Sequence, residues 1–162
     1  PREERIDIYP PALKEKAETL FFMGCVPSYL GMKMTPSLVR VLDDSGLYYT
    51  TLSVDENCFG FPLYLMGSDK FESHAENLME QVKSKGAREL VTPCAGCFKT
   101  FKKIYLEIGD LGVEVYHSVH YLAKLIDAKK IKFEEALDKK VTYHDPCGLG
   151  RAFKILKNQE IS

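Results

Sequence analysis

The sequence predicts an α/β fold: a mainly parallel β-sheet with helices on both faces, in a Rossmann-like three-layer arrangement. Two observations support this prediction. Short apolar segments of strand length alternate with longer segments whose apolar residues recur every three or four positions. The first short segment, residues 19–23, is apolar almost throughout, which is typical of a parallel strand covered on both faces.

The first half of the chain predicts two strands and two helices. Residues 19–23 form the first strand, which ends at Gly24-Cys25. A helix follows from about Pro36, and a turn sequence at residues 43–46 ends it. Residues 47–54 are rich in β-branched and aromatic side chains and predict the second strand. The second helix is predicted at residues 71–85.

The second half continues the alternation. Three more strands are predicted, at residues 89–92, 113–116 and 141–143. Three helices are predicted, at residues 98–108, 119–128 and 151–157. Sequential strands joined by helices form right-handed parallel units, so the carboxyl ends of all five strands are expected at one edge.

The composition excludes several classes of protein. The chain has 162 residues, of which 45% are hydrophobic and 28% charged, as expected for an ordered globular domain. The formal net charge of -1 argues against a nucleic-acid partner, because a phosphate-binding surface needs a basic excess. No apolar run approaches the roughly 18 residues that cross a bilayer, and the sequence does not show the basic head and apolar middle of a signal peptide. We therefore expect a cytoplasmic location.

The placement of the five cysteines is the main functional signal. Cys25 follows the first predicted strand, Cys58 the second, Cys94 and Cys97 the third, and Cys147 the fifth. Open α/β sheets bind ligands at this edge. An odd number of cysteines excludes a fully paired disulfide framework. Clustered thiolates select zinc, iron–sulfur clusters or Cu(I).

The spacing adds detail to this signal. Cys94 and Cys97 open a predicted helix, where the unpaired N–H groups of the first turn favour thiolate over thiol. Cys25, Cys58 and Cys94 are separated by 33 and 36 positions, about one strand–helix unit each. The fold itself would then gather four ligands. Two alternatives remain: buried structural cysteines, and a thioredoxin-like dithiol at Cys94 and Cys97.

At these residues the sequence resembles the cysteine-rich domain known by its CCG motif. The family includes the B and D subunits of heterodisulfide reductase and the iron–sulfur subunits of glycolate oxidase, anaerobic glycerol-3-phosphate dehydrogenase and lactate-utilisation complexes. Cys25 matches the first cysteine of the family pattern, and residues 58–62 match Cys-Cys-Gly-x-Pro with Phe59 in place of the second cysteine. Residues 94–97 match the closing Cys-x-x-Cys. Residues 144–151 resemble the opening of a second copy.

The resemblance implies part of an iron–sulfur oxidoreductase like the D subunit of heterodisulfide reductase, with electron transfer or thiol–disulfide reduction at a cluster. The implied ligands are Cys25, Cys58, Cys94 and Cys97, with Cys147 serving the missing second copy. A five-cysteine copy in the family can hold a non-cubane [4Fe-4S] cluster that cleaves a disulfide, but Phe59 cannot ligate metal. Four thiols suit a cubane [4Fe-4S] cluster or zinc. The alternative function is a zinc-binding or metal-free scaffold for the second copy or a partner protein.

The resemblance also implies the organisation of the chain and its partners. We expect a lead-in at residues 1–17, a first CCG-type domain at 18–139, and a truncated second copy at 140–162 that completes the sheet. The implied partners are an upstream ferredoxin-like domain, the second copy, and a flavoprotein or membrane cytochrome. Association with a membrane would then occur through that partner.

Three histidines are further candidate functional residues. His144 follows the fifth predicted strand and is a candidate catalytic group, outer hydrogen-bonding group or ligand. His117 and His120 flank a strand-to-helix turn, where Ser118 is the expected N-cap. Three lysines follow the Cys-x-x-Cys segment and are interpreted as a solvated helix face, at Lys99, Lys102 and Lys103.

Overall fold

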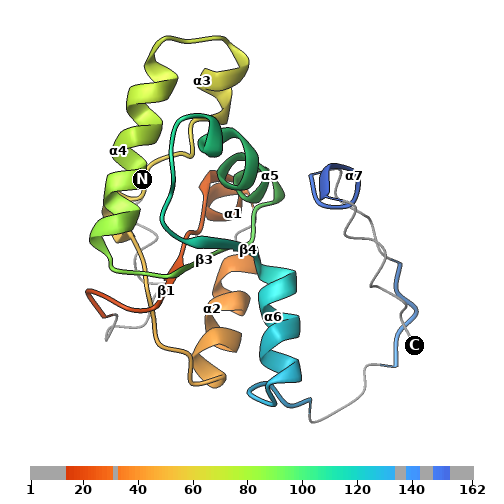
Figure 1. Ribbon diagram of the computed structural model, residues 1–162. Helices are drawn as coiled ribbons and strands as arrows, with labels where there is room; N and C mark the ends of the chain where they lie inside the picture. Colours follow the sequence, from red (N-terminus) through yellow and green to blue (C-terminus); the bar gives the residue numbers. More distant parts are fainter. Residues whose placement is uncertain (1–13, 31–32, 134–137, 143–147, 154–162) are drawn as a thin grey trace.

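The computed structural model of the protein describes residues 14–30, 33–133, 138–142 and 148–153 (Figure 1). Its strands are β1 (Thr19–Phe21), β2 (Tyr49–Thr50), β3 (Glu89–Thr92) and β4 (Glu114–His117). They form a four-stranded sheet in the order β2-β1-β3-β4. Every neighbouring pair is parallel, which confirms the predicted α/β class.

The two central strands are buried on both faces. In the register of β1 with β3, Leu20 pairs with Leu90 and Phe21 with Val91, and each is at most 1% exposed. Successive side chains of a strand point to opposite faces. Accordingly, Leu20 and Leu90 belong to one apolar cluster, and Phe21 and Val91 to the other. The sheet therefore has a core on each side.

Each core is closed by a different pair of helices (Figure 1). The helices α4 (Lys70–Ser84) and α5 (Ala95–Lys99) supply the cluster of Leu20. The helices α2 (Met34–Asp44) and α6 (Ser118–Asp127) supply the cluster of Phe21. The chain runs from β1 outward to β2 and then crosses back to β3, so its direction reverses between the carboxyl ends of β1 and β3. Such a switch point is the usual ligand-binding crevice of an open α/β sheet.

Shorter helical segments complete the described fold. They are α1 (Cys25–Tyr29), η2 (Ser53–Asp55), α3 (Phe61–Leu65), η3 (Thr100–Ile104), η4 (Tyr105–Glu107) and α7 (Gly150–Phe153). The predicted helix at 98–108 is thus not uniform, because α5 widens into the π-helical turn η3 and then tightens into the 3-10 turn η4. Phe101, Ile104 and Tyr105 are all buried there. Their burial offsets the poorer hydrogen-bond geometry of such turns.

Two predicted strands differ from the structure. The second is limited to Tyr49–Thr50, because the backbone turns into η2 and Ser53 adopts a positive φ of 53°. Of the fifth, residues 141 and 142 are described, and both are exposed and lie outside the sheet. Val141 is 78% exposed, so it gains none of the burial that stabilises a strand. Residue 143 lies outside the described residues, as does most of the predicted lead-in, and the domain boundaries stay predictions.

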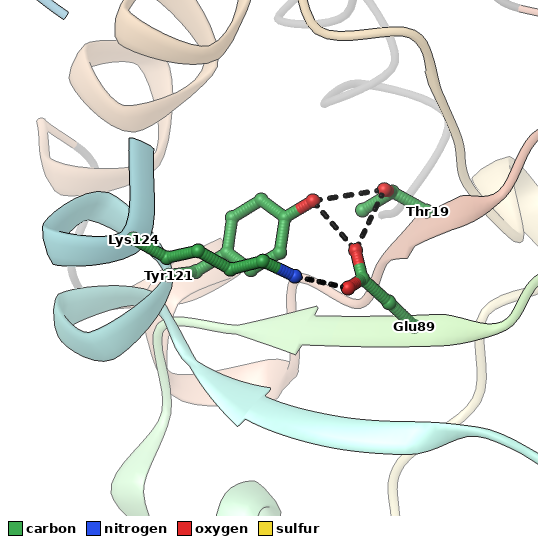
Figure 2. Close-up of polar contacts among 4 residues, drawn as sticks. All are labelled: Thr19, Glu89, Tyr121 and Lys124. Carbon is green, nitrogen blue, oxygen red and sulfur yellow. Dashed lines mark hydrogen bonds and ion pairs between the residues drawn. The ribbon is translucent and has the colours of Figure 1, made fainter. Parts of the chain in front are cut away.

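A polar cluster ties α6 to the amino ends of β1 and β3 (Figure 2). Glu89 accepts hydrogen bonds from the Tyr121 hydroxyl at 2.8 Å, from the Thr19 hydroxyl at 3.4 Å and from the Lys124 ammonium. Burial alone would raise the pKa of Glu89, but these three hydrogen bonds and the Lys124 charge outweigh it and lower that pKa. The carboxylate is therefore ionised at neutral pH and anchors the helix.

Replacement of Tyr121 by Phe should lower the free energy of unfolding by about 1 kcal/mol, because it removes one hydroxyl that bonds both Glu89 and Thr19. Urea titration followed by circular dichroism measures this change. Tyr48→Phe is the matched control, since that side chain is 69% exposed and should change stability little. Equal stability of the two variants would contradict the structural role of the cluster.

Candidate functional site

The four described cysteines all lie beyond the carboxyl ends of the strands. Cys25 is the first residue of α1, and Cys58 lies in the loop before α3. Cys94 is the N-cap of α5, and Cys97 lies within that helix. All four are thiols, and Cys97 is completely buried while the other three are partly exposed. The predicted placement at one sheet edge is confirmed for these residues.

The register of β1 with β3 brings the first and third cysteine loops together. Because Phe21 pairs with Val91, Cys25 and Cys94 each follow within four residues of the last paired position. A Cβ added at Gly24 would lie 2.9 Å from the Cys97 Sγ and 3.5 Å from the Cys94 Cβ. The backbone before Cys25 therefore packs directly on the Cys-x-x-Cys segment.

The Cys58 loop reaches the same place. A Cβ added at Gly96 would lie 3.6 Å from the Phe59 ring and 3.7 Å from the Cys94 Sγ. Charge on Cys58 acts on the Cys94 thiol, and charge on Cys94 and Cys25 acts on the Cys97 thiol. Loops from three strands thus share one electrostatic neighbourhood at the switch point.

Gly24 permits this approach. It has φ 79° and ψ 164°, a backbone conformation that is essentially restricted to glycine. A side chain at this position would also meet the Cys97 sulfur at 2.9 Å. The residue before the first cysteine therefore has two independent reasons to lack a side chain.

Gly24→Ala should reduce the free energy of unfolding by about 2 kcal/mol or more, the sum of backbone strain and overpacking. Gly46→Ala is the control, because Gly46 also has a positive φ of 68° but has nothing within 4 Å of an added Cβ. Urea titration of both variants separates the combined effect of the Cys97 contact and the ψ of 164° at Gly24 from the effect of positive φ alone. If the Gly46 variant were the less stable of the two, the close packing at Gly24 would be wrong.

The two cysteines of α5 are electrostatically unequal. The pKa of Cys94 is lowered to about 6, first by a hydrogen bond from the Cys97 thiol and then by the backbone N–H groups of Cys97 and Gly96. Burial raises the pKa of Cys97 far above its usual range, and donation to Cys94 and the charge on Cys94 raise it further. Cys94 is therefore favoured as a thiolate, mainly by the Cys97 thiol and to a smaller extent by the N–H groups of the helix N-terminus, whereas Cys97 stays protonated.

In the metal-free, reduced chain, Cys94 should react with iodoacetamide along a titration curve centred near pH 6, because only the thiolate attacks. Cys97 should stay unlabelled in the native state over the same range, since it is buried and protonated. Peptide-resolved mass spectrometry measures both rates. In denaturant the two rates should become equal, and native rates that are already equal would contradict the assigned asymmetry.

Two side chains from other elements hold the Cys58 loop. The His74 Nε2 lies 2.6 Å from the Cys58 carbonyl oxygen, and the Tyr105 hydroxyl donates to the Phe59 carbonyl at 3.1 Å. In addition, the buried carboxylate of Glu56, just before Cys58, accepts from the backbone N–H groups of Met23 and Gly24. Sequence reasoning missed all three roles, because the partners are 16 to 46 positions apart and no local spacing links them.

Phe59 is the residue that the resemblance aligns with the second cysteine of the family pattern. It is 9% exposed and stacks on Phe61 with ring centroids 6.2 Å apart. It belongs to the same apolar cluster as Phe98 and Tyr105. An apolar ring therefore lies beside the thiols where a cysteine would have offered a ligand.

The histidines differ in their roles. His117, not the predicted Ser118, is the N-cap of α6, and its Nδ1 accepts from the Val119 N–H at 3.3 Å. Burial, with a smaller contribution from His120, lowers the pKa of His117 to about 4, so the ring is neutral and able to accept. Both His117 and His120 contact the Phe98 ring. His144 lies outside the described residues, so its predicted role stays a prediction.

The lysines after Cys97 are not simply a solvated face. Lys102 donates to the Val115 carbonyl at 3.3 Å, and Lys103 lies over the Phe153 ring at 4.7 Å. Lys99 is partly exposed in the last turn of α5. The first two therefore take part in packing around this helix.

Residues 148–153 pack on the helix that carries the Cys-x-x-Cys segment. A Cβ added at Gly148 would lie 3.2 Å from the Ala95 carbonyl oxygen, and Leu149 is buried in the α5 side of the core. The Phe153 ring lies 4.8 Å from that of Phe98. Cys147 lies outside the described residues.

Within the described ranges, no three His, Cys, Asp or Glu side chains are grouped as ligands of a single metal ion. Thiolates are the ligands that both zinc and iron–sulfur clusters take in proteins. Cys25, Cys58, Cys94 and Cys97 are the described thiols that could hold such a group.

This fold and this edge define a cysteine-rich α/β domain, and comparison with known proteins gives the same result. The chain belongs to the CCG cysteine-rich domain family, whose profile matches residues 19–102. It is 37% identical over 158 residues to the D subunit of the dihydromethanophenazine:CoB–CoM heterodisulfide reductase of Methanosarcina acetivorans, covering 93% of this chain and 39% of that protein. The resemblance seen in the sequence is therefore confirmed.

Other relatives are also redox proteins by name. The chain is 30% identical over 151 residues to the EtfAB:quinone oxidoreductase of Syntrophomonas wolfei, covering 91% of this chain and 21% of that protein. It is 29% identical over 159 residues to the probable iron-sulfur-binding oxidoreductase FadF of Bacillus subtilis, covering 93% and 22%. No solved structure gives a significant match. Among the helices of the described residues, none has the length and apolar character needed to cross a membrane.

Proposed function

We propose that this chain is an iron–sulfur domain of an oxidoreductase like the D subunit of heterodisulfide reductase, in which Cys25, Cys58, Cys94 and Cys97 hold a [4Fe-4S] cluster. The observation that carries the proposal is the meeting of three cysteine loops at the switch point of the sheet. The names of the relatives support iron–sulfur chemistry. When bound, a cluster of this kind supplies one-electron transfer.

The residues of the chain would hold and shield this group. Cys94 is already a thiolate near neutral pH and is ready to ligate. Cys97 must give up its proton on ligation, so metal binding should release protons from the site. His74 and Tyr105 hold the consecutive carbonyl groups of Cys58 and Phe59, and the Phe59 side chain is buried.

Phe59 favours electron relay over disulfide cleavage at this site. Cleavage by the family's five-cysteine copy uses the adjacent cysteine pair, and here the second position carries an apolar ring. We therefore assign electron transfer to this copy. Thiol–disulfide reduction would belong to a second, intact copy in the longer protein, whose other partners would be a ferredoxin-like domain and a flavoprotein or membrane cytochrome.

Metal and sulfide analysis after anaerobic purification tests the ligand set. We expect about four irons and four sulfides per chain, as a [4Fe-4S] cluster requires. Cys94→Ser should lose this content together with the brown absorbance. Cys147→Ser is the matched control and should retain both, because Cys147 is assigned to the second copy.

Two results would contradict this assignment. Full iron content in the Cys94 variant would refute the ligand set. One zinc per chain and no iron in the unsubstituted protein would instead support the structural scaffold.

A further inference from the structure

We propose that Glu56 is the positioning residue of the thiol site: its carboxylate joins the Cys25 loop to the Cys58 loop and places a negative charge within these two loops. The proposal rests on the proposed function only for the cluster measurement below. Glu56 is 4% exposed, whereas its neighbour Asp55 is exposed. A carboxylate is buried in this way only where hydrogen bonds compensate for the loss of water.

Both oxygens of this carboxylate are used. The Glu56 Oε1 accepts from the Gly24 N–H at 2.8 Å, and Oε2 accepts from the Met23 N–H at 2.9 Å. Consecutive backbone N–H groups that converge in this way form an anion-binding nest. In glutamine an NH2 donor replaces one of the two acceptor oxygens, so the arrangement of one oxygen for each N–H group is lost.

The sheet explains why these donors need a side chain. The Phe22 N–H bonds the Val91 carbonyl on the β3 side, and alternation along the strand turns the Met23 N–H toward β2. However, β2 pairs with β1 only at Thr19 and Leu20 and ends at Thr50. The Glu56 carboxylate thus accepts the Met23 hydrogen bond that a longer β2 would accept.

The hydrogen bonds of Glu56 bear on the positions of three of the four thiols. Cys25 directly follows Gly24, and Cys58 follows Glu56 by two positions. Gly24 in turn packs on the Cys97 sulfur. The charge of Glu56 is also among the causes that raise the pKa of the Cys97 thiol.

Glu56→Gln is the test, and Asp55→Asn is the matched control with the same change of charge at an exposed neighbouring position. In the metal-free, reduced chain, Cys97 should be alkylated about tenfold faster in the Glu56 variant, because the Gly24 loop that covers it loses a charge-assisted hydrogen bond. The control should match the unsubstituted chain. Equal labelling of Cys97 in all three proteins overturns the proposal, whether or not the protein binds iron.

Amide hydrogen exchange keeps the test decisive if the Glu56 variant does not fold. In the unsubstituted chain, the Met23 and Gly24 amides should exchange slowly, like the Phe22 amide. If these two amides exchange as fast as the amides of exposed loops, the proposal is overturned. In a folded Glu56 variant, the two amides should exchange about tenfold faster while Val91 is unchanged.

The reduction potential separates this role from a purely structural one. In protein that retains its cluster, Glu56→Gln should shift the potential to a more positive value, because a negative charge beside the site is removed. Asp55→Asn should leave it unchanged, since solvent screens that group. An unshifted potential in the Glu56 variant refutes the electrostatic part of the proposal. Absence of iron from the unsubstituted chain refutes the proposed function, while the labelling and exchange results still decide the positioning role.

Discussion

The approach of Gly24 to the Cys97 sulfur fixes how closely the ends of β1 and β3 can lie, and the rest of the site is built around that contact. Parallel pairing of Phe21 with Val91 brings both strand ends to one level. A glycine-only backbone at residue 24 then lets α1 begin against α5. Any larger residue would separate the first cysteine from the Cys-x-x-Cys pair.

The electrostatics of the site follow from this packing. Burial under the Gly24 loop keeps the Cys97 proton in place, and that proton stabilises the Cys94 thiolate through a hydrogen bond. One negative charge is thus carried where helix N–H groups can balance it. The buried carboxylate of Glu56 adds a second charge, which two backbone N–H groups stabilise. Both negative charges of the site are therefore stabilised by hydrogen-bond donors.

The sequence allowed the sheet and the cysteine edge to be predicted because both depend on local patterns. Apolar runs locate β1 and β3, and Cys25 and Cys94 follow these two strands within four residues. The roles of Glu56, His74 and Tyr105 could not be predicted, because they depend on side chains meeting across the fold. The N-cap of α6 was assigned to Ser118, whereas a buried and neutral His117 accepts that bond.

The assignment to the CCG family places this chain among proteins named as redox enzymes, and it spans 39% or less of the length of the three relatives described above. Phe59 is an apolar ring packed in the core, at the position that the resemblance assigns to a second cysteine. The cluster that we propose therefore has four thiol ligands in this chain, and the proposed role of that cluster is electron transfer.

The most direct measurement of the central claim is an anomalous difference map at the iron edge, from crystals of the anaerobically purified protein. One iron-containing feature is expected at the carboxyl edge of the sheet, bonded to Cys25, Cys58, Cys94 and Cys97. Iron bound elsewhere, or an edge with these four sulfurs bonded to no iron, would contradict that claim.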